Sequence, residues 1–156
     1  MPQEIERKYL VKGDGWRSLA AGVFYSQGYI ATVGQQTVRV RIIGDRGWLT
    51  IKGASKGRTR AEFEYEIPVA EAKEMLDTLC DRPLIEKKRY KILQDNLIWE
   101  VDEFLGENQG LIIAEVELET EEQKIILPDW IDREVTDPKY YNANLAKYPY
   151  SKWQDN

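Results

Sequence analysis

The sequence of 156 residues contains no histidine and only one cysteine, Cys80. Without an imidazole, Ser-His-Asp and Cys-His catalysis are excluded, and so are zinc and iron sites with histidine ligands. One cysteine cannot form an intramolecular disulfide or a thiolate metal cluster, so we expect Cys80 to be a small, buried or half-buried apolar residue. Any bound metal ion must therefore have oxygen ligands, which favours hard cations such as Mg²⁺ or Mn²⁺.

Long hydrophobic runs are also missing, because no apolar stretch approaches the length of a membrane span. Residues 1–4 lack the basic and apolar regions of a signal peptide, so we expect a cytoplasmic protein. The net charge of −5 disfavours non-specific nucleic-acid binding, which needs a cationic surface. With 42% hydrophobic and 31% charged residues, the chain has the composition of a folded globular protein, and its length fits one domain over residues 1–156.

Alternation of apolar and charged residues with a period of two runs through most of the chain and predicts β-strands. Asp95-Asn96 and 44–47 are typical hairpin connections, so the sheet is expected to be mainly antiparallel. The expected strands cover 3–11, 23–33, 36–43, 47–53, 60–68, 84–94, 97–104 and 111–119. Helical spacing appears at 14–21 and more clearly at 69–80. Two later stretches, 121–133 and 139–147, are expected to be partly helical.

Nearly every expected strand has one charged face, because residues two apart in a strand point to the same side. Acidic residues gather on the first, fifth, seventh and eighth strands: Glu4, Glu6, Glu62, Glu64, Asp102, Glu115 and Glu117. Basic residues gather on the third, fourth and sixth strands, with Lys8 added on the first: Lys8, Arg39, Arg41, Lys52, Lys87 and Arg89. The two signs are therefore grouped unevenly over the strands.

Two arrangements account for a charged face of this kind. An open antiparallel sheet with one face in water also produces alternation. Such a face would normally carry Ser, Thr, Asn and Gln, however, and acid-x-acid pairs repel unless a cation lies between them. Closing the sheet into a barrel turns the charged face inward and leaves the apolar face to be covered by helices. Arginine and lysine could then bind phosphate oxygens while carboxylates hold Mg²⁺ or Mn²⁺.

An ordered set of short motifs resembles the CYTH superfamily, also called the triphosphate tunnel metalloenzymes. The resemblance spans essentially the whole chain, and the opening Glu4-Ile5-Glu6-Arg7-Lys8 matches that family's Glu-x-Glu-x-Lys pattern. The other matching segments follow in order: Val38-Arg39-Val40-Arg41, Leu49-Thr50-Ile51-Lys52, Glu62-Phe63-Glu64, Lys87-Lys88-Arg89-Tyr90, Trp99-Glu100-Val101-Asp102 and Ala114-Glu115-Val116-Glu117.

The resemblance implies an α+β fold: a mainly antiparallel eight-stranded barrel, with helices outside and a C-terminal helix near one tunnel mouth, in segment 140–146. It implies a triphosphate clamp of Lys8, Arg39, Arg41, Lys52, Lys87 and Arg89. It also implies a metal-binding set of Glu4, Glu6, Glu62, Glu64, Asp102, Glu115 and Glu117. For catalysis we expect Glu4 or Glu6 to orient the attacking water. Lys87, with a pKa lowered by nearby cations, and Tyr29 would assist.

The function implied is metal-dependent hydrolysis of a triphosphate, and the small-molecule partner is the triphosphate itself. Short length and Tyr29 favour inorganic tripolyphosphate, although Tyr29 also fits a simple packing role in a strand. The alternatives are a nucleoside or thiamine triphosphatase, an adenylate cyclase, or a polyphosphate-binding module without catalysis. A homodimer is left open, as is gating of the tunnel by the 53–57 loop and the C-terminal segment.

Overall fold

The computed structural model describes residues 3–54, 56 and 59–153, and of Gln3 and Glu4 it describes the backbone alone. All eight expected strands are present, and none of their ends is displaced by more than three residues. A ninth strand, β9, follows them. The strands are β1 (Gln3–Val11), β2 (Gly22–Ile30), β3 (Thr37–Ile43), β4 (Arg46–Lys52), β5 (Thr59–Ile67), β6 (Ile85–Gln94), β7 (Leu97–Phe104), β8 (Ile112–Glu117) and β9 (Ile131–Val135).

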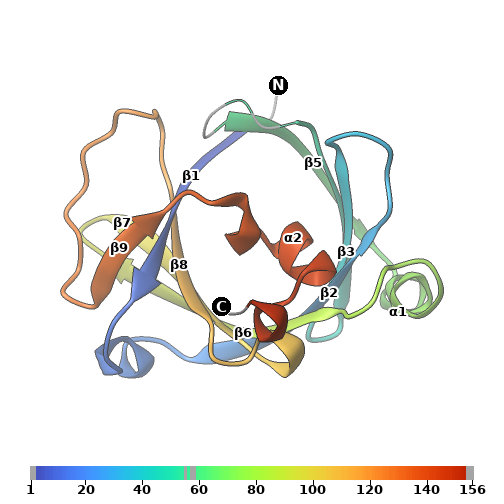
Figure 1. The fold of residues 1–156 in the computed structure, drawn as a ribbon, viewed down its shortest axis with the longest axis horizontal. Helices are drawn as coiled ribbons and strands as arrows, with labels where there is room; N and C mark the ends of the chain where they lie inside the picture. Colours follow the sequence, from blue (N-terminus) through green and yellow to red (C-terminus); the bar gives the residue numbers. More distant parts are fainter. Residues whose placement is uncertain (1–2, 55, 57–58, 154–156) are drawn as a thin grey trace.

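The strands form a closed antiparallel barrel, in the order β5-β4-β3-β2-β6-β7-β8-β1 (Figure 1). Closure occurs where Gln3, Glu4 and Ile5 of β1 pair with Ala61, Arg60 and Thr59 of β5. Further along β1, from Lys8 to Val11, β9 pairs with the same edge of the strand. The prediction of an eight-stranded antiparallel barrel is confirmed, and β9 is an addition to it.

The tight turn between β6 and β7 contains Asp95 and Asn96, whose φ angles are 53° and 64°. Two consecutive residues with positive φ are typical of the hairpin turn that matches strand twist, and Asn and Asp tolerate this conformation better than most residues. The predicted hairpin at this position is therefore confirmed.

Two of the helical predictions need correction. Segment 121–133 is not helical: it contains turns and extended chain, and its last residues begin β9. Ile131 and Val135 of β9 are buried against the barrel, so long-range packing decides this segment rather than local spacing. Segment 14–21 forms only one 3-10 turn, η1 (Gly15–Ser18).

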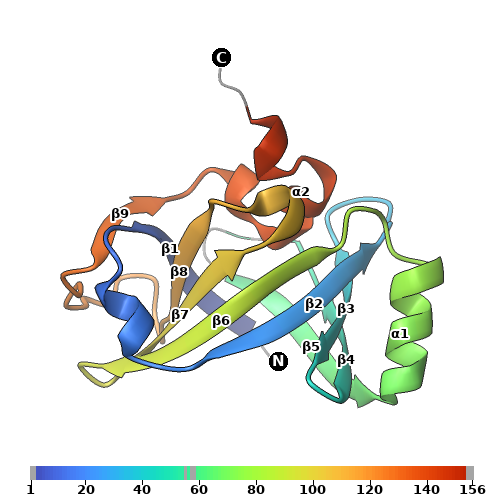
Figure 2. The ribbon, with the colours of Figure 1, turned by 90° about the horizontal axis from the view of Figure 1, so that it is seen from below.

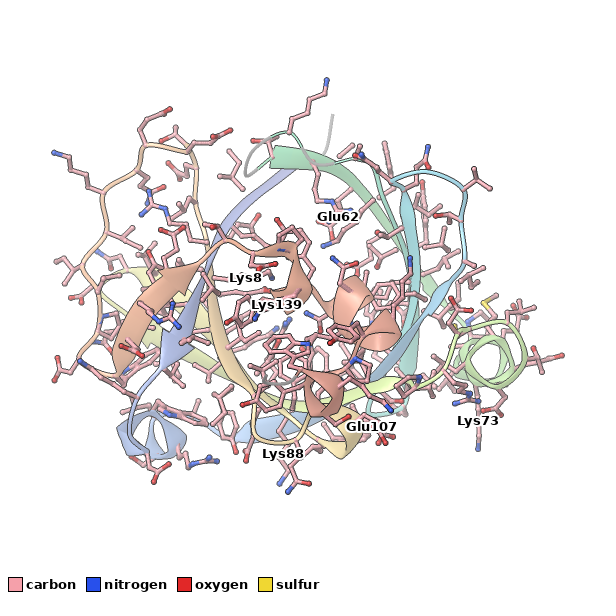
Figure 3. The ribbon with its side chains drawn as sticks, in the orientation of Figure 1. Lys8, Glu62, Lys73, Lys88, Glu107 and Lys139 are labelled. Atoms are coloured by element: carbon pink, nitrogen blue, oxygen red, sulfur yellow. The ribbon has the colours of Figure 1, made fainter. Side chains whose placement is uncertain are left out.

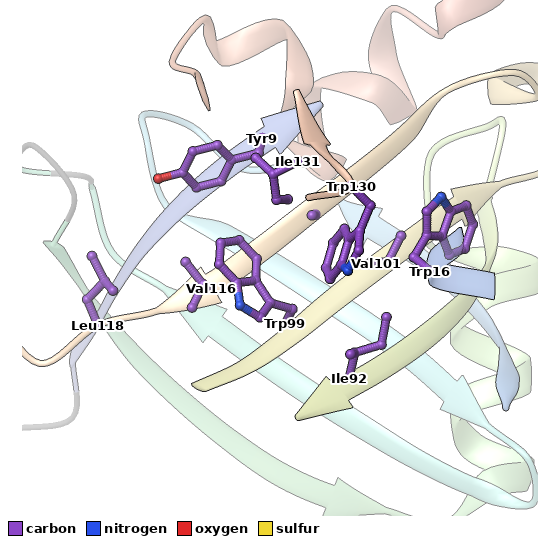
Figure 4. Close-up of a cluster of buried hydrophobic side chains, with 10 residues drawn as sticks. Tyr9, Trp16, Ile92, Trp99, Val101, Val116, Leu118, Trp130 and Ile131 are labelled. Atoms are coloured by element: carbon purple, nitrogen blue, oxygen red, sulfur yellow. The ribbon is translucent and has the colours of Figure 1, made fainter. Parts of the chain in front are cut away.

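The outer face of β1, β7 and β8 is covered by an aromatic cluster (Figure 4). Trp99 is fully buried at its centre, with ring centroids 5.6 Å from Tyr9 and 5.8 Å from Trp130, both in edge-on contact. Trp130 immediately precedes β9, and Trp16 of η1 adds a further buried ring. Burial of aromatic surface, reinforced by edge-on contacts, therefore holds β9 and η1 on the barrel.

Helix α1 (Val69–Thr78) confirms the predicted helix and covers the outer face on the opposite side of the barrel (Figure 1). Its buried residues Ala72 and Leu76 pack against Val40 of β3. Gly47 in β4 allows this close approach, because a Cβ atom there would lie 2.7 Å from the Cβ of Ala72. No helix in the described part of the chain has the length and apolar character to cross a membrane.

The C-terminal segment lies across one end of the barrel (Figures 1 and 2). Its helix α2 (Asn142–Lys147) buries Leu145 and Ala146 against inward-facing residues that include Tyr29 and Phe104. At this end the lining of the barrel changes from charged to apolar, which explains why α2 docks there. The expected C-terminal helix near one tunnel mouth is present. Short 3-10 turns accompany it: η2 (Gly106–Asn108), η3 (Pro138–Tyr140) and η4 (Tyr150–Lys152).

Replacement of Trp99 by alanine should lower the free energy of unfolding by about 3–5 kcal/mol, because it leaves a large cavity in the aromatic cluster. Leu93→Ala is the control, since Leu93 is 75% exposed on β6 and should change stability by at most about 0.5 kcal/mol. Urea unfolding followed by circular dichroism measures both. Equal losses for the two variants would show that the cluster does not hold the fold.

Candidate functional site

The interior of the barrel is lined by charged side chains. Lys8, Arg41, Lys87, Arg89 and Asp102 are all buried there, although lysine and arginine are seldom buried in proteins. In Figure 3 Lys8 and Glu62 lie within the ring of strands, whereas Lys73 and Lys88 lie outside it. The charged face of the sheet therefore turns inward, as the alternation predicts.

Asp102 of β7 is the acidic centre of this interior. Lys87 Nζ donates to its Oδ2 at 2.8 Å, and Arg89 donates to both of its oxygens at 2.7 and 2.8 Å. Burial acts to raise the pKa of Asp102, but the charges of Arg89 and Lys87 outweigh burial and lower the pKa. Asp102 is therefore a carboxylate whose oxygens already hold two cations.

Lys87 has a lowered pKa, as predicted from its cationic surroundings. Burial and the charge of Arg89 lower it, and Asp102 opposes them only in part. The pKa of Arg41 falls to about 9, because the guanidinium is buried and lies near Arg39 and Arg89. Positive charge therefore exceeds negative charge in this part of the interior, and an anion would relieve the excess.

Tyr25 of β2 lies at the centre of the cations. Its ring centroid is 5.0 Å from the guanidinium carbon of Arg41, 5.1 Å from that of Arg89 and 5.8 Å from Lys87 Nζ. An aromatic face attracts cations through its quadrupole without carrying a charge of its own. Tyr25 can thus hold three cationic side chains close together without neutralising their charge, which stays available to an anionic ligand.

A second group lies on β3, β4 and β5. Arg39 donates to the hydroxyl of Thr50 at 3.3 Å and lies 3.7 Å from the carboxylate of Glu64. Thr50 in turn donates to Glu64 at 2.9 Å. Lys52 pairs in register with Glu62, and both are half-buried. These strands therefore place cations and carboxylates next to one another.

The third group is on β1 and β8. Lys8 forms an ion pair with Glu115 and lies 3.3 Å from Glu6. Burial acts to lower the pKa of Lys8, but the two glutamates raise it above its ordinary value. Burial acts to raise the pKa of Glu115, but Lys8 and Arg89 lower it below the ordinary range. Glu6 and Glu117 are direct cross-strand neighbours, an arrangement that a cation between them would stabilise.

The predicted metal ligands lie on strands of the same barrel, but those whose side chains are described do not form a single coordination shell. Among the described residues, no three acidic side chains form a group that could hold a metal ion. The side chain of Glu4 lies outside the described residues, while Glu64 and Glu117 are exposed and Glu6, Glu62 and Glu115 are half-buried. The metal set therefore stays a prediction.

Four polar residues of the interior were missed by the sequence analysis: Tyr25, Gln27, Thr50 and Asn142. Tyr25 and Gln27 share the inward phase of Tyr29 on β2, and Thr50 shares that of Lys52 on β4. Period-two spacing could have found these three residues, had uncharged side chains been counted. Asn142 enters from α2, which only the folded chain brings to the barrel.

Comparison with known proteins gives a consistent result. The CYTH domain family matches residues 2–146 of this chain. An inorganic triphosphatase of Acetivibrio thermocellus is 55% identical over 156 residues, covering 99% of this chain and 100% of that protein. An inorganic triphosphatase of Nitrosomonas europaea is 37% identical over 148 residues, covering 92% of this chain and 96% of that protein.

Solved structures share the barrel. The crystal structure of an inorganic triphosphatase has a TM-score of 0.65 and 32% identity, covering 91% of this chain and 96% of the other. A Hippeastrum protein, assigned as an adenylyl cyclase and found to have a dominant triphosphatase activity, has a TM-score of 0.60 and 16% identity, covering 76% and 81%. At that identity the likeness shows the fold alone.

Asp102→Asn should lower the free energy of unfolding at neutral pH by about 3–5 kcal/mol, because it removes the buried carboxylate charge that contacts both Lys87 and Arg89. The pKa of Asp102 is lowered in the folded state, so its contribution is present above the ordinary value of 3.8 and is lost as the pH falls below it. The difference between wild type and variant should therefore shrink in acid.

Urea unfolding at a series of pH values measures this difference. Asp132→Asn, at an exposed carboxylate on β9, is the control and should change stability by at most about 0.5 kcal/mol. A constant difference between wild type and Asp102→Asn down to about pH 2 would contradict the assigned ion pairs.

Proposed function

The chain belongs to the CYTH domain family, and from this membership and the charge of the barrel interior we propose that it hydrolyses inorganic tripolyphosphate to pyrophosphate and orthophosphate. The observation that carries the proposal is the excess of buried positive charge around Tyr25: Arg41, Lys87 and Arg89 are buried there, and among the described residues Asp102 is the one buried carboxylate. A linear triphosphate is a compact polyanion that can contact cations on several strands at once. The relatives from Acetivibrio thermocellus and Nitrosomonas europaea are both named inorganic triphosphatases, which supports this choice of substrate.

We assign substrate binding to the inward-facing cations Lys8, Arg39, Arg41, Lys52, Lys87 and Arg89. Arginine suits this role, because its planar guanidinium can donate two parallel hydrogen bonds to a phosphate group. Tyr25 and Asp102 hold three of these cations in place before substrate arrives. Preorganised charge of this kind is usually the largest contribution to phosphoryl transfer, which depends on positioning and charge neutralisation.

The carboxylates fit a divalent metal ion by their chemistry, since they supply only oxygen ligands. We assign Mg²⁺ or Mn²⁺ to residues from Glu4, Glu6, Glu62, Glu64, Glu115 and Glu117. Asp102 was predicted to join this set, but its oxygens are occupied by Lys87 and Arg89, so we give it the role of orienting these cations. When bound, the metal would neutralise phosphate charge and lower the pKa of a bound water.

The remaining steps depend on the chain's own residues. In the absence of histidine, a carboxylate must orient the attacking water, and Glu4 or Glu6 on β1 has this role in our proposal. Lys87 donates to Asp102 and to Asn142, which leaves the third proton of its ammonium group for a phosphate oxygen. Tyr29 carries its hydroxyl on the same inward face and accepts a hydrogen bond from Gln27.

We expect the purified protein to release orthophosphate and pyrophosphate from tripolyphosphate with Mg²⁺ or Mn²⁺, and to lose this activity in excess chelator. ATP and thiamine triphosphate, assayed at the same concentration, should be poorer substrates. Faster turnover of either organic triphosphate would identify a nucleoside or thiamine triphosphatase instead, and a cyclic nucleotide product would identify a cyclase. Tight binding of tripolyphosphate with no turnover under any metal would leave only a binding module.

Arg41→Ala should raise the KM for tripolyphosphate roughly tenfold or more, because it removes a charge-assisted phosphate contact worth about 1.5–3 kcal/mol. The double variant Glu115→Ala with Glu117→Ala should instead raise the metal concentration needed for half-maximal rate. Lys88→Ala is the control, since Lys88 is exposed outside the ring of strands and should alter neither value (Figure 3). If Arg41→Ala changed only the metal requirement, the division of roles would be wrong.

A further inference from the structure

Two buried or half-buried amides, Gln27 and Asn142, connect the cations of the proposed clamp. Gln27 is fully buried on the inward face of β2. Asn142 is the first residue of α2 and reaches the barrel from the C-terminal segment. Neither side chain can bear a charge, and neither is used in the mechanism above except as a hydrogen-bond partner.

The two amides form a continuous chain of hydrogen bonds. Gln27 Oε1 accepts from Arg41 Nε at 2.8 Å, and Gln27 Nε2 donates to Asn142 Oδ1 at 3.5 Å and to the Tyr29 hydroxyl at 3.1 Å. Asn142 Oδ1 also accepts from Lys87 Nζ at 3.0 Å. Arg41 on β3 and Lys87 on β6 are thus joined through Gln27 and Asn142, which we call the amide relay.

An amide at these positions differs from a carboxylate in its effect on the charge of the neighbouring cation. Its carbonyl oxygen orients a cation by accepting a hydrogen bond, but it does not cancel the cation's charge. Gln27 binds Arg41 through Nε, so this contact does not use the two terminal nitrogens of the guanidinium, which form the fork that suits phosphate. The relay therefore fixes the position of Arg41 and Lys87 while keeping their charge for an anion.

We propose that Gln27 and Asn142 are positioning residues for tripolyphosphate, acting as one unit on Arg41 and Lys87. The inference rests on the proposed function and deepens it. It also gives the C-terminal segment a defined part in substrate binding, because α2 supplies Asn142 to a site whose other residues lie on the barrel strands. The hydrogen bond from Lys87 to Asn142 couples the docking of α2 to the position of Lys87.

The test compares Asn142→Ala, Gln27→Leu and their double variant in steady-state kinetics and in calorimetric binding of tripolyphosphate without metal. Each single variant should raise KM and the dissociation constant roughly tenfold, because a misplaced cation loses a charge-assisted contact, while kcat falls by less. The dissociation constant of the double variant should be no higher than that of the weaker-binding single variant, since each single substitution already breaks the same relay. Effects that multiply would show two independent structural roles and would overturn the proposal.

Gln27→Glu tests the importance of the neutral amide. It keeps an acceptor for Arg41 but adds a negative charge, so it should weaken tripolyphosphate binding while the melting temperature is maintained. Wild-type affinity in this variant would contradict the proposal. Asn144→Ala is the matched control on α2, because Asn144 donates to the Pro138 carbonyl and should leave KM unchanged.

Folding and function are separated in this design. If Gln27→Leu fails to fold, Asn142→Ala provides the test, because Asn142 is only half-buried. An unchanged KM and an unchanged dissociation constant in Asn142→Ala would then refute the relay. If the wild type binds tripolyphosphate but does not hydrolyse it, the proposed function fails and the calorimetric comparison still decides the relay. A wild type that does not bind tripolyphosphate would refute both.

Discussion

The hydrogen-bonded contact of Asp102 with Lys87 and Arg89 organises the charges in the interior of the barrel. Burial of cations is costly unless they are paired, and one carboxylate here serves two of them. Among the described residues, Arg41 has no carboxylate partner of this kind and is held by the neutral Gln27. Pairing with Asp102 therefore offsets part of the cost of burying these cations, while the excess of buried positive charge favours an anion.

A polar interior has a consequence for the stability of the fold, because it cannot serve as the hydrophobic core. The apolar packing lies instead on the outside of the barrel, where β9 and η1 cover one side and α1 covers another. The cluster around Trp99 and the packing of Leu76 supply the burial that holds the strands together. Where α2 docks, the described part of the interior itself becomes apolar.

Apart from Asp102, which is buried among the cations, several carboxylates of the barrel lie closer to solvent than the buried cations do. Arg41, Lys87 and Arg89 are deeply buried, while Glu64 and Glu117 are exposed to solvent. Buried cations bind phosphate oxygens strongly because little water competes with them. Exposed carboxylates keep access to metal ions, whose arrival and departure require exchange of water ligands. This difference is consistent with the proposed division of the interior into anion-binding cations and metal-binding carboxylates.

The eight barrel strands, the hairpin at Asp95-Asn96 and the charged side chains that share a face could all be predicted from the sequence. Period-two alternation and turn chemistry are local properties of the chain, so they can be recognised without knowing the fold. The tertiary structure was needed to show that β9 occupies part of a segment predicted to be partly helical, and that α2 brings Asn142 to Lys87. These contacts join segments far apart in the chain, and they depend on apolar surfaces that exist only after the barrel has closed.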